Sequence, residues 1–224
     1  MFKIEQKYRS SYTGEDVTTQ MTIQGQTQDY EKEWVPNNVF NNHITTQAVV
    51  LGGGEICKNF NLDLIKNHKG GLFGASKLQT YGCNGIYKLI ECDFLVVIGR
   101  ENAAEVAKSG YCNNHVVYSN AGNVLDYPGK YYLVPQDPSW NSGAIAAYLA
   151  AFDGHNKIFL LGGEIDNDHP FWAKAMRIVF DTYPAVDFVL IGESDDANVP
   201  PEWKDALNLR VISKRDFIVE ADIG

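Results

Sequence analysis

The chain has 224 residues, 45% of them hydrophobic and 21% charged, which is typical of one soluble globular domain with room for an appendage. The formal net charge of −9 argues against a large surface for duplex nucleic acid, because neutralising phosphates requires clustered lysine and arginine. No apolar run approaches the roughly 18 residues of a membrane helix, and the N-terminal segment lacks the apolar core of a signal peptide. We therefore expect a cytoplasmic protein with no membrane partner.

The first 40 residues differ from the rest of the chain in their pattern of apolar and polar residues. Apolar and polar residues alternate near Phe2 and again from Val17 to Ile23, and residues 12–15 have turn composition. This pattern predicts an N-terminal β-hairpin arm and linker over 1–40, followed by the main domain over 41–224. Because a two-stranded hairpin is marginal alone, we expect it to pack on the main domain or to hold a second copy in a homo-oligomer.

The main domain opens with an apolar run that stops on three glycines. Residues 48–51 are continuously apolar, as expected of a strand buried on both faces of a parallel sheet. Gly52, Gly53 and Gly54 then allow a sharp turn and a close approach to a ligand. If 55–68 is a helix, its first amides form an anion site beside the glycines. The pattern favours phosphate or nucleotide binding; the alternative is a tight turn without a ligand.

Apolar runs and helical patterns alternate along the rest of the chain. Further strands are predicted at 72–75, 93–98, 115–118, 131–134, 157–161, 188–191 and 209–212. Helices are predicted at 55–68, 84–90, 102–108, 142–152, 171–182 and 202–207. This alternation predicts an α/β fold with a doubly wound, mostly parallel Rossmann-like sheet and helices on both faces. Ligands of such sheets bind outside the carboxyl ends of the strands, so residues that follow strands are the site candidates.

Polar residues at strand ends and helix starts are candidate nucleotide ligands. Besides the three glycines, they are Ser76, Asn84, Arg100, Asn141, Ser142 and Gly143. Ser142 and the amide of Gly143 could hold a phosphate at a helix start, although Ser142 is equally a plain N-cap. The dinucleotide fingerprint is incomplete, which makes an NAD-dependent dehydrogenase a weak candidate, and the P-loop pattern is absent.

The loop at 162–169 is the most acidic of the predicted strand ends. Asp166 and Asp168 carry oxygen ligands of the kind that Mg²⁺ prefers when it also binds a phosphate. Glu164, Asp166 and His169 are the candidate catalytic residues, with His169 as a general base near neutral pH. The alternative is a solvated acidic loop in which His169 is structural.

The four cysteines show neither the paired spacing of a zinc site nor a disulfide framework. Each lies among residues with the pattern of buried or structural positions. We therefore expect reduced thiols in the core. They are Cys57, Cys83, Cys92 and Cys112.

Three motifs in a fixed order carry a family resemblance. The segments VVLGGGEICKNF, TYGCNGIYKLIECDFLVVIG and SGAIAAYLAAFDGHNKIFLLGGEID resemble the MptE-like family, the 6-hydroxymethylpterin diphosphokinase-like proteins, and are similar to bacterial CMP-sialic-acid-dependent sialyltransferases. The resemblance covers roughly 46–168. Where these families have Gly-Asn-Gly-Pro-Ser, this chain has Gly52-Gly53-Gly54-Glu55-Ile56, which adds a negative charge.

The resemblance implies an α/β nucleotide-binding fold and assigns roles to particular positions. It implies that Gly52, Gly53 and Gly54 contact the nucleotide, Asn84 its sugar or base, and Ser142 and Gly143 a phosphate, with Glu164 or Asp166 as the acidic position. Our leading hypothesis is a nucleotide-binding transferase that moves a glycosyl or diphosphate group from a CMP-sugar or ATP type of donor, with or without Mg²⁺. The alternatives are a non-catalytic protein that binds or sequesters a nucleotide, and a structural or assembly protein that uses the N-terminal arm.

Overall fold

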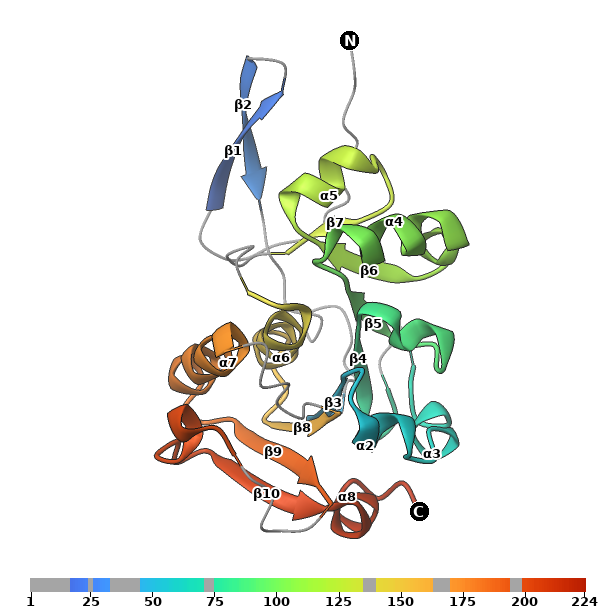
Figure 1. The fold of residues 1–224 in the computed structure, drawn as a ribbon, viewed down its shortest axis with the longest axis vertical. Helices are drawn as coiled ribbons and strands as arrows, with labels where there is room; N and C mark the ends of the chain where they lie inside the picture. Colours follow the sequence, from blue (N-terminus) through green and yellow to red (C-terminus); the bar gives the residue numbers. More distant parts are fainter. Residues whose placement is uncertain are drawn as a thin grey trace.

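The computed structural model describes the backbone of 17–23 and 26–32, and residues 45–70, 75–134, 140–162, 170–193 and 199–224. The main element is an eight-stranded sheet in which all neighbouring strands are parallel (Figure 1). Its strands are β3 (Gln47–Leu51), β4 (Gln79–Cys83), β5 (Phe94–Val96), β6 (Val116–Ser119), β7 (Tyr132–Leu133), β8 (Lys157–Leu161), β9 (Asp187–Gly192) and β10 (Leu209–Ser213). The order β10-β9-β8-β3-β4-β5-β6-β7 confirms the predicted doubly wound sheet.

The winding direction reverses between β3 and β8. From β3 the chain moves outward through β4, β5 and β6 to β7, then returns to β8 on the other side of β3 and continues to β9 and β10. In this register Val50 of β3 lies between Tyr81 of β4 and Leu160 of β8. Because all strands are parallel, the carboxyl ends of β3 and β8 meet at one edge, where ligands of doubly wound sheets bind.

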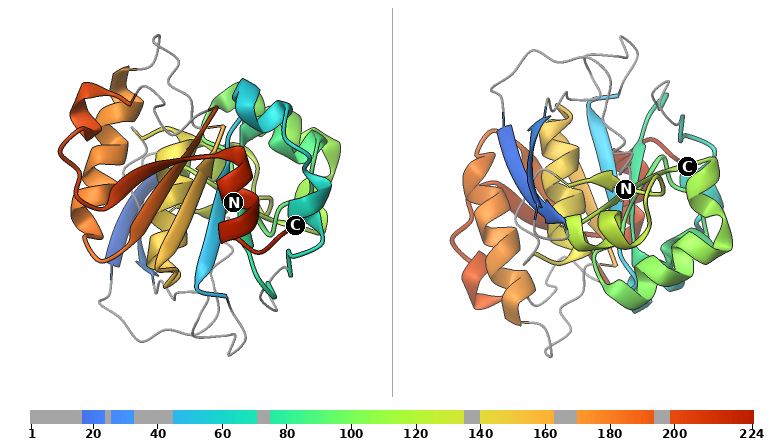
Figure 2. Two further views of the ribbon diagram at one scale, coloured as in Figure 1. Left: turned by 90° about the horizontal axis from the view of Figure 1, so that it is seen from below. Right: turned by 90° about the horizontal axis from the view of Figure 1, so that it is seen from above.

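Helices cover both faces of the sheet (Figure 2). One face packs against α6 (Ser142–Phe152), α7 (Pro170–Thr182) and the 3₁₀ helix η4 (Pro201–Trp203). The other packs against α2 (Glu55–Lys58), α3 (Asp63–Lys66), η2 (Asn84–Lys88), α4 (Arg100–Ser109), η3 (Tyr111–Asn113), α5 (Ala121–Asp126) and α8 (Lys214–Glu220). In β3, Ala48 and Val50 join the first core and Val49 and Leu51 the second, which explains the continuous apolar run. Helix α6 has the predicted bounds.

The helix predicted at 55–68 is in fact two four-residue helices. Asn59 caps α2, Phe60 turns into the core with 8% of its surface exposed, and the side-chain oxygen of Asn61 accepts a hydrogen bond from the amide of Asp63 at 3.3 Å. An asparagine that bonds the backbone two residues on favours a turn over a continuous helix. The helices predicted at 84–90 and 202–207 are likewise shorter, and both are 3₁₀ helices.

Strand β4, which pairs with β3 on the side away from β8, lies later in the sequence than the strand predicted at 72–75, of which 72–74 are outside the described residues. The β4 sequence QTYGC carries polar residues that are nonetheless buried. Thr80 is satisfied by the carboxylate of Asp93, and the side-chain oxygen of Gln79 accepts from the amide of Ala75. Polar residues with internal partners can lie in a buried strand, and their pattern then gives no apolar signal.

The backbone of β1 (Val17–Ile23) pairs antiparallel with β2 (Gln26–Lys32), with Ile23 opposite Gln26. The described partner of β1 therefore follows it in the sequence, and the partner predicted near Phe2 lies outside the described residues. The turn predicted at 12–15 and the boundary at residue 40 lie outside the described residues. The role of this arm in assembly stays a prediction.

Candidate ligand-binding cavity

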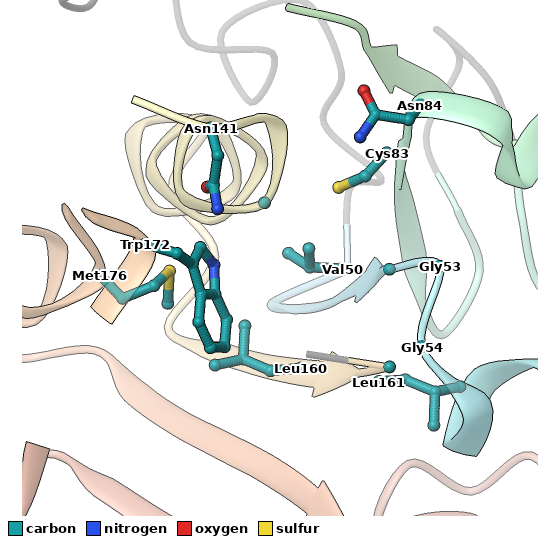
Figure 3. A pocket seen from close by; sticks show the side chains of 13 residues that line it. Val50, Gly53, Gly54, Cys83, Asn84, Asn141, Leu160, Leu161, Trp172 and Met176 are labelled. Carbon is teal, nitrogen blue, oxygen red and sulfur yellow. The ribbon is translucent and has the colours of Figure 1, made fainter. Parts of the chain in front are cut away.

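A cavity of about 390 Å³ lies at the carboxyl ends of β3, β4 and β8, beside the first turns of α6 and α7 (Figure 3). This volume falls within the range of small-molecule sites. The lining residues are Val50, Gly52, Gly53, Gly54, Cys83, Asn84, Asn141, Gly143, Leu160, Leu161, Gly162, Trp172 and Met176. The cavity therefore sits where the winding direction of the sheet reverses.

The backbones that follow β3 and β8 touch at one side of the cavity. The amide of Gly52 donates to the carbonyl of Leu161 at 2.8 Å, and the amide of Gly54 donates to the carbonyl of Gly162 at 3.3 Å. Gly162 has a φ of +74°, and a Cβ there would lie 2.5 Å from Cβ of Cys57. Glycine is thus required at 162 both by the backbone conformation and by the close approach.

Because of these hydrogen bonds, the glycine turn offers fewer free amides to an anion than the sequence predicts. The Gly54 amide is engaged within the protein, and α2 has only four residues, so the long-helix N-terminus expected there does not form. Gly53 is exposed, and its amide has no hydrogen bond to any residue in the described part of the chain. Glu55 is also exposed and pairs with Lys58 at 3.0 Å, which turns its charge to the surface and away from the cavity lining.

Asn84 is held at the cavity by Ser142. The Ser142 hydroxyl accepts a hydrogen bond from the amide of Ile98 at 3.2 Å and donates to Oδ1 of Asn84 at 2.8 Å. Asn84 adopts a φ of +50°, which is uncommon for a residue other than glycine. This backbone conformation is strained, and the surrounding contacts hold it in place. Ser142 is buried and does not line the cavity, so its position suits orienting Asn84.

The N-cap of α6 is Asn141, and Ser142, which the sequence allowed as a cap, is the first helical residue. The side-chain oxygen of Asn141 accepts from the amide of Ala144 at 2.9 Å. The amides of Ser142 and Gly143 then have no hydrogen-bond partner among the residues described by the structure. In an eleven-residue helix these free first-turn amides favour an acceptor or an anion.

An apolar wall that the sequence analysis did not single out completes the cavity. Trp172 and Met176 come from the first two turns of α7, and Leu160 comes from the end of β8 (Figure 3). The indole of Trp172 packs against Trp203 with the ring centroids 4.8 Å apart. Trp172 and Met176 are four residues apart, which places them on one face of a helix that follows a strand-end loop. This spacing is the feature of the sequence that could have predicted the apolar wall.

Cys83 lines the cavity, and its burial disfavours the nucleophilic thiolate form. Burial raises the pKa of its thiol to about 12, so the unreactive thiol form dominates. All four cysteines are buried and reduced, as expected of core thiols.

Two of the predicted nucleotide ligands lie away from this cavity. Ser76 is exposed and precedes β4, at the opposite edge of the sheet, because the strand begins later than predicted. Arg100 begins α4, extends into solvent and pairs with Asp126 at 3.0 Å. The catalytic and metal candidates Glu164, Asp166, Asp168 and His169 lie outside the described residues. Within the described ranges, no group of three or more His, Cys, Asp or Glu residues is placed to hold a metal.

The fold and the cavity define the class: a doubly wound α/β protein with a small-molecule-sized cavity at the point where strand order reverses. No family model, curated protein or solved structure matches the chain. None of the helices in the described part of the chain combines the length and apolar character needed to span a bilayer.

Proposed function

We propose that the cavity binds a nucleotide and that the protein is a nucleotide-dependent transferase. The observation that carries the proposal is the meeting of three chain segments at one cavity: the glycine turn after β3, Asn84 after β4, and Gly143 at the start of α6. The amides of Gly53 and Gly143, which have no partner among the described residues, suit phosphate oxygens, and the apolar wall suits a base or sugar.

The motif order that resembles the MptE-like proteins and the CMP-sialic-acid-dependent sialyltransferases supports the same proposal. The positions that the resemblance assigns to the nucleotide are Gly52, Gly53, Gly54, Asn84, Ser142 and Gly143. All of them line this cavity except Ser142, which holds Asn84. Residues that are distant in sequence but adjacent at a switch point are what a nucleotide site on this fold requires.

The transfer chemistry would come from the loop that follows β8. Glu164 and Asp166 would position or stabilise the transferred group, His169 would act as a base, and Asp166 and Asp168 would bind Mg²⁺ with the phosphates. Gly162, the last described residue before this loop, lines the cavity, so the loop starts beside the proposed nucleotide. The donor would be of the CMP-sugar or ATP type.

A second candidate is a protein that binds or sequesters a nucleotide without turnover. Cys83 favours it, because among the described lining residues it is the only one with an ionisable side chain, and its raised pKa of about 12 keeps it neutral. Under this candidate the same cavity binds the nucleotide, and no product forms over hours of incubation with CMP-sugar or ATP.

Titration calorimetry with CMP, CDP, ATP and ADP, each with and without Mg²⁺, tests the binding step. We expect at least one nucleotide to bind the wild type and Gly143→Ala to weaken it at least about tenfold. An added Cβ at Gly143 would lie 3.1 Å from Nε1 of Trp172 and would obstruct the space between α6 and the indole. Loss of about 1.4 kcal/mol corresponds to that factor.

The matched control is Gly85→Ala, because a Cβ at Gly85 meets nothing within 4 Å and Gly85 does not line the cavity. This variant should bind as the wild type does. The proposal fails if none of the four nucleotides binds the wild type, or if Gly143→Ala and Gly85→Ala bind equally well.

A further inference from the structure

We infer that Trp172 is a specificity-determining residue of the cavity, whose indole N–H donates a hydrogen bond to a phosphate oxygen of the ligand. The inference rests on the proposed nucleotide function. It specifies that the phosphate group of the ligand binds beside Trp172. Trp172 is 9% exposed, and its Nε1 has no hydrogen-bond partner among the residues that the structure describes. Since the ring is largely buried while its N–H opens onto the cavity, this donor is available to an acceptor on a bound ligand.

The neighbouring indole provides an internal comparison. Trp203 packs against Trp172, is 1% exposed, and donates from Nε1 to the carbonyl of Ala173 at 2.8 Å. One of the two packed indoles is therefore satisfied within the protein. The other lines the cavity, and its ring nitrogen is directed into the open space (Figure 3). Packing against Trp203 fixes the orientation of that donor before any ligand binds.

Gly143 leaves the indole N–H accessible. A Cβ at this position would lie 3.1 Å from Nε1 of Trp172, so the missing side chain creates the gap between the start of α6 and the indole. The Gly143 amide beside this gap is free within the described part of the chain. The indole N–H and a first-turn helix amide thus flank the same space.

The hydrogen-bond network at Asn84 adds a third donor. The Ser142 hydroxyl accepts from the amide of Ile98, so its own hydrogen must go to Asn84, which requires Oδ1 at that position. The amino group Nδ2 of Asn84 is then left for the cavity side, as drawn in Figure 3. These three groups donate, and the side-chain oxygen of Asn141, which lies 3.7 Å from the position of a Cβ at Gly143, already accepts from the amide of Ala144.

A corner in which three donors are open and the nearby acceptor of Asn141 is already engaged selects for an acceptor on the ligand. A phosphate oxygen matches it, whereas an ammonium or an amide N–H would leave donors facing donors. The adjacent apolar wall of Leu160 and Met176 would contact the part of the ligand that carries no charge. The ligand class is therefore a nucleotide phosphate bound by neutral donors, with its less polar portion on this wall.

The test compares CMP with cytidine on the wild type and on Trp172→Phe, which keeps an aromatic ring and removes the donor. We expect the wild type to bind CMP more tightly than cytidine, and Trp172→Phe to lose about tenfold or more for CMP with little change for cytidine. Equal CMP affinity of the two proteins would overturn the inference and leave the nucleotide proposal standing. If the wild type binds neither CMP nor any other nucleotide, both the inference about Trp172 and the proposed nucleotide function are overturned.

A second readout needs no substitution in the site. In ¹H–¹⁵N spectra of the wild type, the indole N–H resonance of Trp172 should move downfield when CMP is added. The indole N–H resonance of Trp203, which already has an acceptor, should stay within its linewidth. A Trp172 resonance that does not move at saturating CMP would overturn the inference even if Trp172→Phe fails to fold.

Discussion

Gly162→Ala should lower the free energy of unfolding by roughly 2–4 kcal/mol. The φ of +74° at this position penalises any residue with a Cβ. The new methyl carbon would also lie 2.5 Å from Cβ of Cys57 in α2 and 3.1 Å from the carbonyl oxygen of Gly52, where the backbone after β3 contacts the backbone after β8. Urea unfolding followed by tryptophan fluorescence measures the change.

The matched control for this variant is Gly53→Ala. A Cβ at Gly53 meets nothing within 4 Å, and its φ lies outside the left-handed region. We expect its unfolding free energy to stay within about 0.5 kcal/mol of the wild type. Equal stability of Gly162→Ala and Gly53→Ala would show that position 162 does not require glycine.

Asp93→Asn should cost about 2–4 kcal/mol of stability, because a buried carboxylate that accepts three hydrogen bonds from described residues would be replaced by an amide with one acceptor oxygen. Asp93 is 6% exposed. Its Oδ2 accepts from the amide and the hydroxyl of Thr80, each at 2.8 Å, and its Oδ1 accepts from the amide of Gly70 at 3.0 Å. In either orientation, the new amino group faces an N–H. Urea unfolding under the same conditions measures the loss.

The same substitution at an exposed aspartate controls for the change in charge. Asp63 is exposed in the first turn of α3, and Asp63→Asn should stay within about 0.5 kcal/mol of the wild type. Asp93 also fixes β4 beside β5, and Asn84 follows β4 directly, so nucleotide binding should weaken in Asp93→Asn. Wild-type stability in Asp93→Asn would show that the three hydrogen bonds contribute little.

The parts of the fold that the sequence predicted are those where burial dominates. The strand at 48–51 and the helix at 142–152 are apolar on nearly every side, and such segments have few alternatives to the core. Strand β4 was missed because Gln79 and Thr80 are buried with internal partners, which only the three-dimensional structure reveals. The break in the helix at 55–68 depended on the turn at Asn61, a local side-chain bond that competes with periodicity.

The residues of the candidate site likewise divide into those that the sequence pattern predicts and those that depend on three-dimensional contacts. Gly53, Asn84 and Gly143 were predicted because the carboxyl ends of parallel strands and the helix starts beside them share one edge of the sheet. Ser76 was predicted at this edge because a strand was expected just before it, whereas β4 begins after it, at Gln79. Trp172 was missed because an aromatic residue on an amphipathic helix is ordinarily part of the core, and its open N–H becomes evident only from packing.

A crystal structure grown with the tightest-binding nucleotide of the four tests directly whether the cavity binds a nucleotide phosphate. We predict phosphate density between Gly53 and Gly143, within hydrogen-bonding distance of Trp172 Nε1 and Asn84 Nδ2, with the rest of the nucleotide against the apolar wall. Density for the nucleotide elsewhere on the protein, or an empty cavity at a saturating concentration, would contradict the account.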